Sequence, residues 1–197
     1  MRSHRIRTSA AAITAVVALP LSLGAFAPQT FASGAASSTP SPFGPGCSQL
    51  PHSGKGSAAD MSKEHVATAA ANNPKLTKLA LALKDAGLTT KLNDAKHITV
   101  FAPTNAAFDK VSKMQLAGLL KDKGQLKKVL TYHVVGKTIT PDDLPNGSFK
   151  TLEGSMLKTS GSGTTFKVND TAKIVCGDIE VANARVYLVD TVLMPPS

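Results

Sequence analysis

The stretch ITVFAPTNAAFDKV, residues 98–111, decides the fold, because an apolar strand pattern stops at a proline and a helix pattern begins at once. Pro103 ends the predicted strand, since it has no N–H to offer a neighbouring strand. Thr104 or Asn105 can accept a hydrogen bond from a free N–H of the next turn, which starts the helix. Phe108 then turns back into the core. The only nucleophile of the loop is an unactivated threonine, so we interpret it as a structural corner and not as a catalytic loop.

The N-terminal segment is typical of a secretory signal peptide. Three arginines precede an apolar run over residues 10–27, and small residues follow. We assign residues 1–32 to the signal peptide and expect cleavage within residues 27–36, where positions after Ala32 or Ala35 avoid Pro28. A membrane anchor is the alternative, but the run is shorter than the ~20 residues that a spanning helix needs. We therefore expect a secreted, extracellular protein with no membrane span after signal removal.

The charge of the chain suggests which partners it meets. The formal charge of +9 includes the three leader arginines, which leaves +6 for the rest of the chain. A modest basic excess on a secreted protein suggests anionic surfaces such as cell-wall polymers, lipid headgroups or acidic glycans, although it also serves ordinary solubility. Nucleic acid is not expected, because Arg185 is the only arginine after the leader, Trp is absent and aromatic residues are few.

The remaining chain divides into a tether and one domain. Residues 33–59 are rich in Ser, Pro and Gly and predict a flexible tether. Residues 60–197 form the predicted domain, in which helices come first: residues 62–72 capped by Asp60, a second helix that starts at Pro74 and stops at Gly87, then 104–111 and pieces between 116 and 130. Short segments with turn residues follow Tyr132, and they predict a β-meander with strands over 149–152, 155–159, 164–168, 172–176, 178–182 and 185–193.

The order of these elements fixes the expected class. Helices precede most strands, so the chain is predicted to be α+β and not a series of βαβ units. The segment 185–193 is apolar on both alternating faces, so we expect it to be a central strand that is covered on each side.

Three stretches resemble the signatures of the fasciclin domain family. TVFAPTNAAF, which contains Phe101, looks like the first signature; YHVV at 132–135 is similar to the central Tyr-His box; and VYLVDTVLMP, which contains Asp190, is similar to the closing signature. The three occur in the family order, and the resemblance covers about residues 60–196. It is strongest to the secreted, single-domain fasciclin-type immunogenic proteins of mycobacteria and other actinobacteria.

This resemblance implies a wedge-shaped β-sandwich with the N-terminal helices packed along one edge. It also implies extracellular adhesion or ligand binding without catalysis. The similar proteins place one cysteine in the N-terminal extension and one in a late Val-Cys-Gly strand, as Cys47 and Cys176 do here. An oxidising compartment favours pairing of two cysteines, so we expect a disulfide. Some animal members bind integrins through Asp-Ile motifs, but this chain has Asp143-Leu144, so that activity does not carry over.

Catalytic, metal and cofactor sites are not expected. The histidines lack the spacing of a metalloprotease helix, and phosphate-binding, dinucleotide-binding and serine-hydrolase motifs are absent from the sequence. Two cysteines without a matching histidine pattern do not make a zinc site. Three other residues have more than one interpretation. Asp190 falls in a strand that should be buried, so it needs hydrogen-bond donors, which a backbone amide, a hydroxyl or His133 could supply. We expect His133 to be a hydrogen-bonded core residue with Asp190 as its preferred partner, or else part of a binding surface. Tyr132 is expected to pack its ring and to show its hydroxyl.

A group of lysines is the remaining candidate for binding. They concentrate between residues 109 and 128, and the four that we single out are Lys121, Lys123, Lys127 and Lys128. They form either a solvated face or a docking patch for an anionic partner. We therefore predict a secreted adhesive module that binds an extracellular protein or an anionic surface or matrix component, and we expect a monomer. The alternative is a soluble carrier of a small apolar molecule or lipid in a cleft between helices and sheet.

Overall fold

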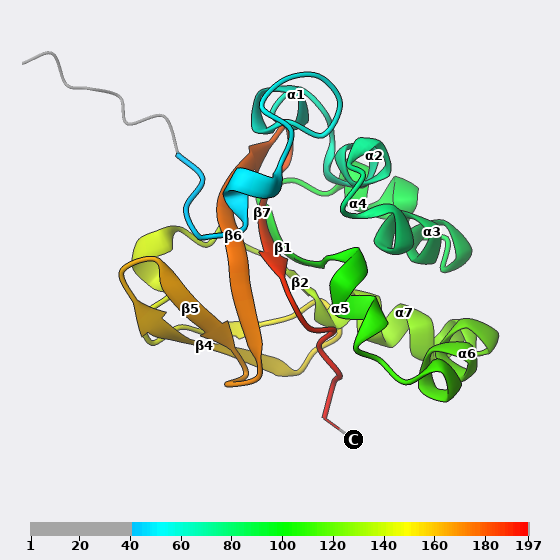
Figure 1. Ribbon diagram of the computed structural model, residues 1–197. Coiled ribbons are helices and arrows are strands. Elements are labelled where there is room, and N and C mark those ends of the chain that lie inside the picture. The colour runs from blue at the N-terminus through cyan, green and yellow to red at the C-terminus, as the bar shows by residue number, and fades with distance from the viewer. Residues whose placement is uncertain (1–40, 197) are drawn as a thin grey trace, which may run out of the picture. The chain divides into compact units, whose positions relative to one another are not determined.

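A computed structural model describes residues 41–196 (Figure 1). The predicted signal peptide, its cleavage position and the first part of the predicted tether lie outside the described residues, as does Ser197. The α+β class is confirmed. Helices gather on one side of the strands β1 and β7, while β4 and β5 lie on the other side (Figure 1).

Seven strands form a single sheet in the order β2-β1-β7-β6-β5-β4-β3. Only the β1–β7 pair is parallel among these ladders. The two ends of the sheet meet, because Val135 bridges Thr151 and the Leu152 N–H donates to the Val134 carbonyl at 2.7 Å. The sheet is thus nearly closed, and the wedge-shaped sandwich that the family resemblance implies stays a prediction. The strands are β1 Ile98–Pro103, β2 Val134–Val135, β3 Ser148–Lys150, β4 Met156–Ser162, β5 Thr165–Val168, β6 Ala172–Val181 and β7 Ala184–Val189.

The predicted central strand is present as β7. Its neighbours are β1 on one side and β6 on the other, and its side chains are buried on both faces except at Arg185. The strand ends at Val189 and not at residue 193. At the next residue the Asp190 N–H donates to the Lys173 carbonyl at 3.1 Å, while the Asp190 side chain takes the place of a backbone carbonyl and accepts the Lys173 N–H at 2.8 Å. The two strands predicted over 172–176 and 178–182 are one strand, β6, with irregular register between Cys176 and Ile179.

The helices carry apolar faces that pack against this sheet and against one another. Gly87, at a φ of 66°, follows the end of α3 as predicted. Within residues 41–196 the helices are α1 Ala58–Met61, α2 Val66–Asn72, α3 Thr77–Asp85, α4 Thr89–Asp94, α5 Asn105–Asp109, α6 Lys113–Lys121 and α7 Lys123–Tyr132, with the 3-10 turns η1 Cys47–Gln49 and η2 Pro141–Asp143.

Two predicted helix starts are wrong. Asp60 does not cap a helix; its N–H instead donates to the Ser57 hydroxyl at 3.2 Å, and Ser57 caps the separate short helix α1. Pro74 does not begin α3, which starts at Thr77, because the Asn73 side chain accepts the Lys75 N–H at 2.9 Å and holds a turn there. Local side-chain hydrogen bonds of this kind compete with helix formation.

The corner after β1 joins the sheet to two helices. Thr104 caps α5 by accepting the Ala107 N–H at 3.3 Å. Asn105 serves another helix: its Oδ1 accepts the Lys78 N–H at 3.0 Å, at the start of α3, where the N-cap residue Leu76 has no side-chain acceptor. The predicted corner is therefore a junction: Thr104 caps α5, and Asn105 caps α3, which comes earlier in the chain.

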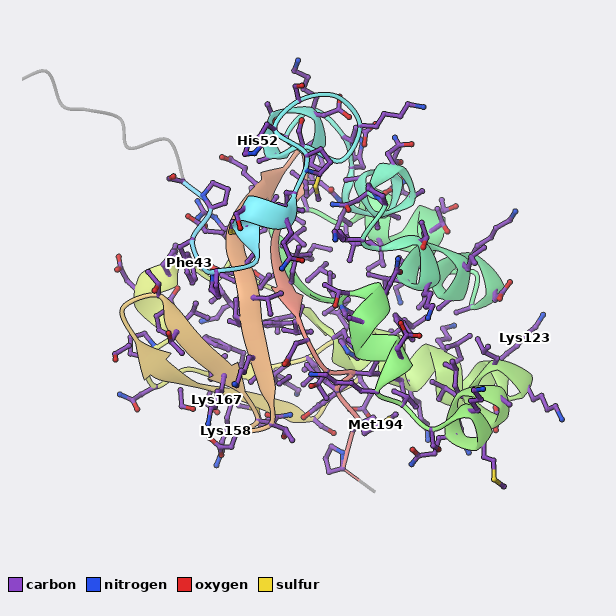
Figure 2. All side chains as sticks on the ribbon, in the orientation of Figure 1. Phe43, His52, Lys123, Lys158, Lys167 and Met194 are labelled. Atoms are coloured by element: carbon purple, nitrogen blue, oxygen red, sulfur yellow. A yellow bond between two sulfur atoms is a disulfide. The ribbon has the colours of Figure 1, made fainter. Side chains whose placement is uncertain are left out.

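Part of the predicted tether lies on the sheet. Phe43 exchanges backbone hydrogen bonds with Gly177 of β6 at 3.1 and 2.8 Å, and its ring meets Phe166 edge-on at 5.5 Å between centroids (Figure 2). Cys47 and Cys176 form a disulfide with a Cα–Cα distance of 4.8 Å, which uses both cysteines of the chain. The described chain from Phe43 onward thus belongs to the packed structure, while the domain limits stay predictions.

We expect the disulfide to stabilise the domain strongly, because it closes a loop with a sequence separation of 129 residues. Replacing Cys47 and Cys176 by Ser should lower the free energy of unfolding by about 2–5 kcal/mol. Urea unfolding of the oxidised protein, with and without dithiothreitol, measures the effect. Dithiothreitol should leave the double variant unchanged, and labelling of the unreduced, denatured wild type should find no free thiol; two labelled cysteines would contradict the bridge.

Candidate functional site

His133 follows α7 and is buried, with 1% of its surface exposed. Its Nδ1 lies 2.7 Å from the Val129 carbonyl, and its Nε2 accepts the Leu193 N–H at 3.0 Å. The Nδ1 therefore carries the proton, and both ring nitrogens are occupied by backbone groups. The expectation that Asp190 is the partner of His133 is wrong, because a backbone N–H takes that place.

Tyr132 is buried with its hydroxyl, so the expectation of an exposed phenol oxygen is also wrong. Only 2% of the residue is exposed. The hydroxyl donates to the Met156 carbonyl at 3.1 Å and accepts from Asn169 Nδ2 at 2.7 Å. Tyr132 thus fastens the end of α7 to β4 and to the turn after β5, and it offers no surface to a partner.

Asp190 lies at a polar junction rather than in the apolar interior. Its carboxylate accepts from Lys110 Nζ at 2.9 Å, from the Lys173 N–H at 2.8 Å and from the Thr191 hydroxyl at 3.0 Å. Partial burial opposes ionisation, but these donors prevail and lower the pKa of Asp190. The donors that a half-buried carboxylate requires are therefore present, and the residue ties the end of α5 to the sheet.

The lysines of α6 and α7 are exposed. Ion pairs in the part of the chain that the structure describes join Lys78 to Asp109, Lys110 to Asp190 and Arg185 to Asp178, and none involves the lysines of these two helices. Asp122, the acid between the two helices, accepts the Gly124 and Gln125 N–H groups as the cap of α7. We define the lysine face as the five unpaired members of this group: Lys113, Lys121, Lys123, Lys127 and Lys128.

The geometry of the two helices sets the lysine face on their outer sides. Leu119 of α6 and Leu126, Val129 and Leu130 of α7 point inward and are buried. Figure 2 shows Lys123 reaching away from the α6–α7 pair, whereas Lys158 and Lys167 lie by β4 and β5. The four lysines predicted as a docking patch are thus brought together on one pair of helices, while Tyr132 and His133 lie beneath and apart from them.

A groove of about 580 Å³ lies beside the disulfide. The N-terminal segment forms one wall, the start of α5 forms another, and β6 and β7 contribute the rest. Its lining is mostly apolar and includes Pro45, Leu50, Pro74, Ala106, Val175 and Leu188. This groove could not be predicted from the sequence, because one of its walls comes from residues that were predicted to form a tether.

Comparisons with known proteins identify the family. The family model described as the Fasciclin domain matches residues 74–195. The chain belongs to the fasciclin domain family. This fasciclin domain protein is 43% identical over 163 residues to the cell surface glycolipoprotein MPB83 of Mycobacterium bovis, a match that covers 79% of the chain and 73% of the relative. It is 41% identical over 162 residues to the immunogenic protein MPB70 of the same species, covering 78% of the chain and 82% of the relative.

A solved structure shows the same fold at lower identity. The FAS1 domain pair of the insect cell adhesion molecule Fasciclin I matches with a TM-score of 0.50 and 18% identity, covering 60% of this chain and 45% of that one. The suspected membership in this family is therefore confirmed by sequence and by fold. In residues 41–196 of this fasciclin domain, no helix combines the length and the apolar character needed to cross a membrane.

We expect His133 to make the stability of this fasciclin domain depend on pH. Burial lowers the pKa of His133 from 6.5 to about 4, although the hydrogen bond to Val129 acts in the opposite direction. Between pH 6.5 and pH 4 the unfolded chain therefore binds a proton at His133 that the folded chain does not bind. The contribution of His133 to the free energy of unfolding is fully present above pH 6.5 and is lost as the pH falls towards 4. The loss between pH 7 and pH 5 should be about 2 kcal/mol.

Urea unfolding at the two pH values measures this loss. His133→Leu removes the titrating group, so it should be less stable at pH 7 but should show a smaller difference between pH 7 and pH 5. An equal difference in wild type and variant would show that other groups cause the pH dependence.

Proposed function

We propose that this fasciclin domain acts outside the cell as a monomeric, non-catalytic module that binds an anionic surface or an extracellular protein. One observation carries the proposal: the five lysines of the lysine face form no ion pair within residues 41–196, and the one acid among them caps a helix. Exposed lysines that form no ion pair can attract an oppositely charged surface, and Glu153 is an acid whose charge interacts with that of Lys128.

Other observations support a binding role without catalysis. The relatives are named a cell surface glycolipoprotein and an immunogenic protein, and the similar solved structure comes from a cell adhesion molecule. Both nitrogens of His133 are occupied by backbone groups, so its imidazole is not free to act as a base. The disulfide fits an oxidising, extracellular location.

We expect charge reversal on the lysine face to abolish binding to an immobilised acidic polymer such as heparin. The variant changes Lys121, Lys123, Lys127 and Lys128 to Glu, and wild-type binding should weaken steadily with added salt, because charges more than about 10 Å apart are screened at ~0.1 M. The matched control makes the same charge change on the sheet, at Lys150, Lys158, Lys167 and Lys173, all of which are exposed. Circular dichroism checks that both variants fold.

The two variants separate site from net charge. Loss in the helix variant alone supports the proposal, whereas equal loss in both would show that total charge, and not the lysine face, governs binding. Binding that neither salt nor either variant changes would contradict it and would favour the second candidate below.

The second candidate is a carrier of a small apolar molecule or lipid, and the groove beside the disulfide favours it. Native mass spectrometry of the purified protein would reveal a copurifying ligand. Ala106 lies exposed at the groove, so Ala106→Trp should fill space there with little effect on the fold and should displace that ligand. Ala117→Trp, on the exposed side of α6, is the control. A wild-type protein that carries no ligand would contradict this candidate.

A further inference from the structure

The helix α6 exposes apolar side chains among the lysines. Within this helix of nine residues, Met114 is 88% exposed and Leu120 is 45% exposed. Residues at i, i+3, i+4 and i+7 share a helix face. Met114 therefore lies on one outer face with Ala117, Gly118 and Lys121, opposite the buried Leu119.

The middle of this outer face of α6 consists of small, exposed residues. Ala117 and Gly118 are exposed, and a Cβ added to Gly118 would meet no atom within 4 Å. Only Met114 and Lys121 project far from it, so a flat partner can approach the helix closely. Single exposed apolar residues are common and need no explanation. Met114 lies two helical turns before Lys121, which forms no ion pair. Lys121 is the last residue of α6, where the chain turns into α7 and the lysine face continues.

We propose that α6 and the lysine face dock on an anionic lipid bilayer, with Met114 entering the headgroup layer. The inference rests on the proposed function and names the partner class of the same site. Charge complementarity argues for this occupant, since lysines near an anionic membrane surface each strengthen binding by roughly fivefold. A hydrated polymer needs only the charges, whereas a bilayer also offers apolar depth to a flexible, unbranched side chain.

The chemistry of the face fits a fluid surface better than a structured protein partner. Protein interfaces draw their binding energy mainly from Trp, Tyr and Arg. The stretch 109–131 contains none of these three, and its cations are all lysines. Lysine is a flexible point charge that does not demand the fixed, two-pronged geometry that arginine supplies, and mobile lipid headgroups can move to meet it.

Tryptophan fluorescence tests the insertion directly, because the chain contains no tryptophan. Met114→Trp places a single reporter on α6, and Leu81→Trp is the matched control, since Leu81 is a 62% exposed apolar residue on α3. Vesicles of equal parts phosphatidylglycerol and phosphatidylcholine should shift the emission of the position-114 reporter to shorter wavelength. They should leave the position-81 reporter unchanged, and vesicles of phosphatidylcholine alone should shift neither.

Vesicle flotation of the full chain measures affinity in parallel. Changing Lys121, Lys123, Lys127 and Lys128 to Gln should weaken binding to the anionic vesicles by roughly a hundredfold or more. Met114→Gln should weaken it by roughly tenfold, because burying a methionine side chain is favourable, but should leave binding to heparin unchanged.

The remaining outcomes overturn the inference in distinguishable ways. Vesicle binding without a shift at position 114 would show that charge alone acts, and a shift at both positions would show that the vesicles unfold the protein. Heparin binding that depends on the lysines, without binding to anionic vesicles, would overturn the lipid partner and leave the proposed function standing. Heparin binding that does not depend on the lysines would overturn both.

Discussion

The parallel pairing of β1 with β7 is the constraint on which the remaining structure depends. It runs from Ile98 opposite Ala184 to Pro103 opposite Val189 and so joins segments that lie far apart in the chain. Phe101 and Tyr187 stack across it with ring centroids 5.5 Å apart, and the Tyr187 hydroxyl donates to the Ile139 carbonyl at 2.9 Å. Because β1 leads directly into the corner at Thr104, the same pairing sets where α5 begins and where α3 is capped.

Tyr132 and His133 link the sheet to the helix α7, which carries part of the lysine face. Both residues lie at the end of α7, where their polar atoms bond to β4, to the turn after β5 and to the chain beyond β7. They therefore fix the orientation of a helix whose outer side carries lysines. The proposed binding by the lysine face would therefore depend on this signature through the position of α7, even though Tyr132 and His133 are themselves buried.

Sequence patterns predicted the parts of this fold that depend on local chemistry. A proline predicted the corner, apolar residues on both faces predicted the central strand, and short segments between turn residues predicted the meander. The disulfide was expected from two cysteines in a chain with a predicted signal peptide. Partners that are chosen across the fold could not be predicted. His133 was expected to bond to Asp190 because a carboxylate in a buried strand needs donors, but the three donors that converge on Asp190 in the folded chain are Lys110, the Lys173 N–H and Thr191. Asn105 and Asn183 likewise complete helices that are distant in sequence: Asn183 accepts the Val66 N–H at 2.9 Å and donates to the Ala95 carbonyl at 2.7 Å.

The bond between Cys47 and Cys176 also changes the connectivity of the molecule. It turns most of the domain into a covalent ring, since the two cysteines have a sequence separation of 129. A protease that cuts one peptide bond anywhere inside this ring leaves a single molecule, whose two pieces stay tied at β6 and can still pack together. The α6–α7 junction and the turns that join β3 to β4, β4 to β5 and β5 to β6 lie within the ring, whereas the turn between β6 and β7 lies outside it. Survival after nicking, and not only resistance to unfolding, is therefore built into the chain by one pair of sulfur atoms.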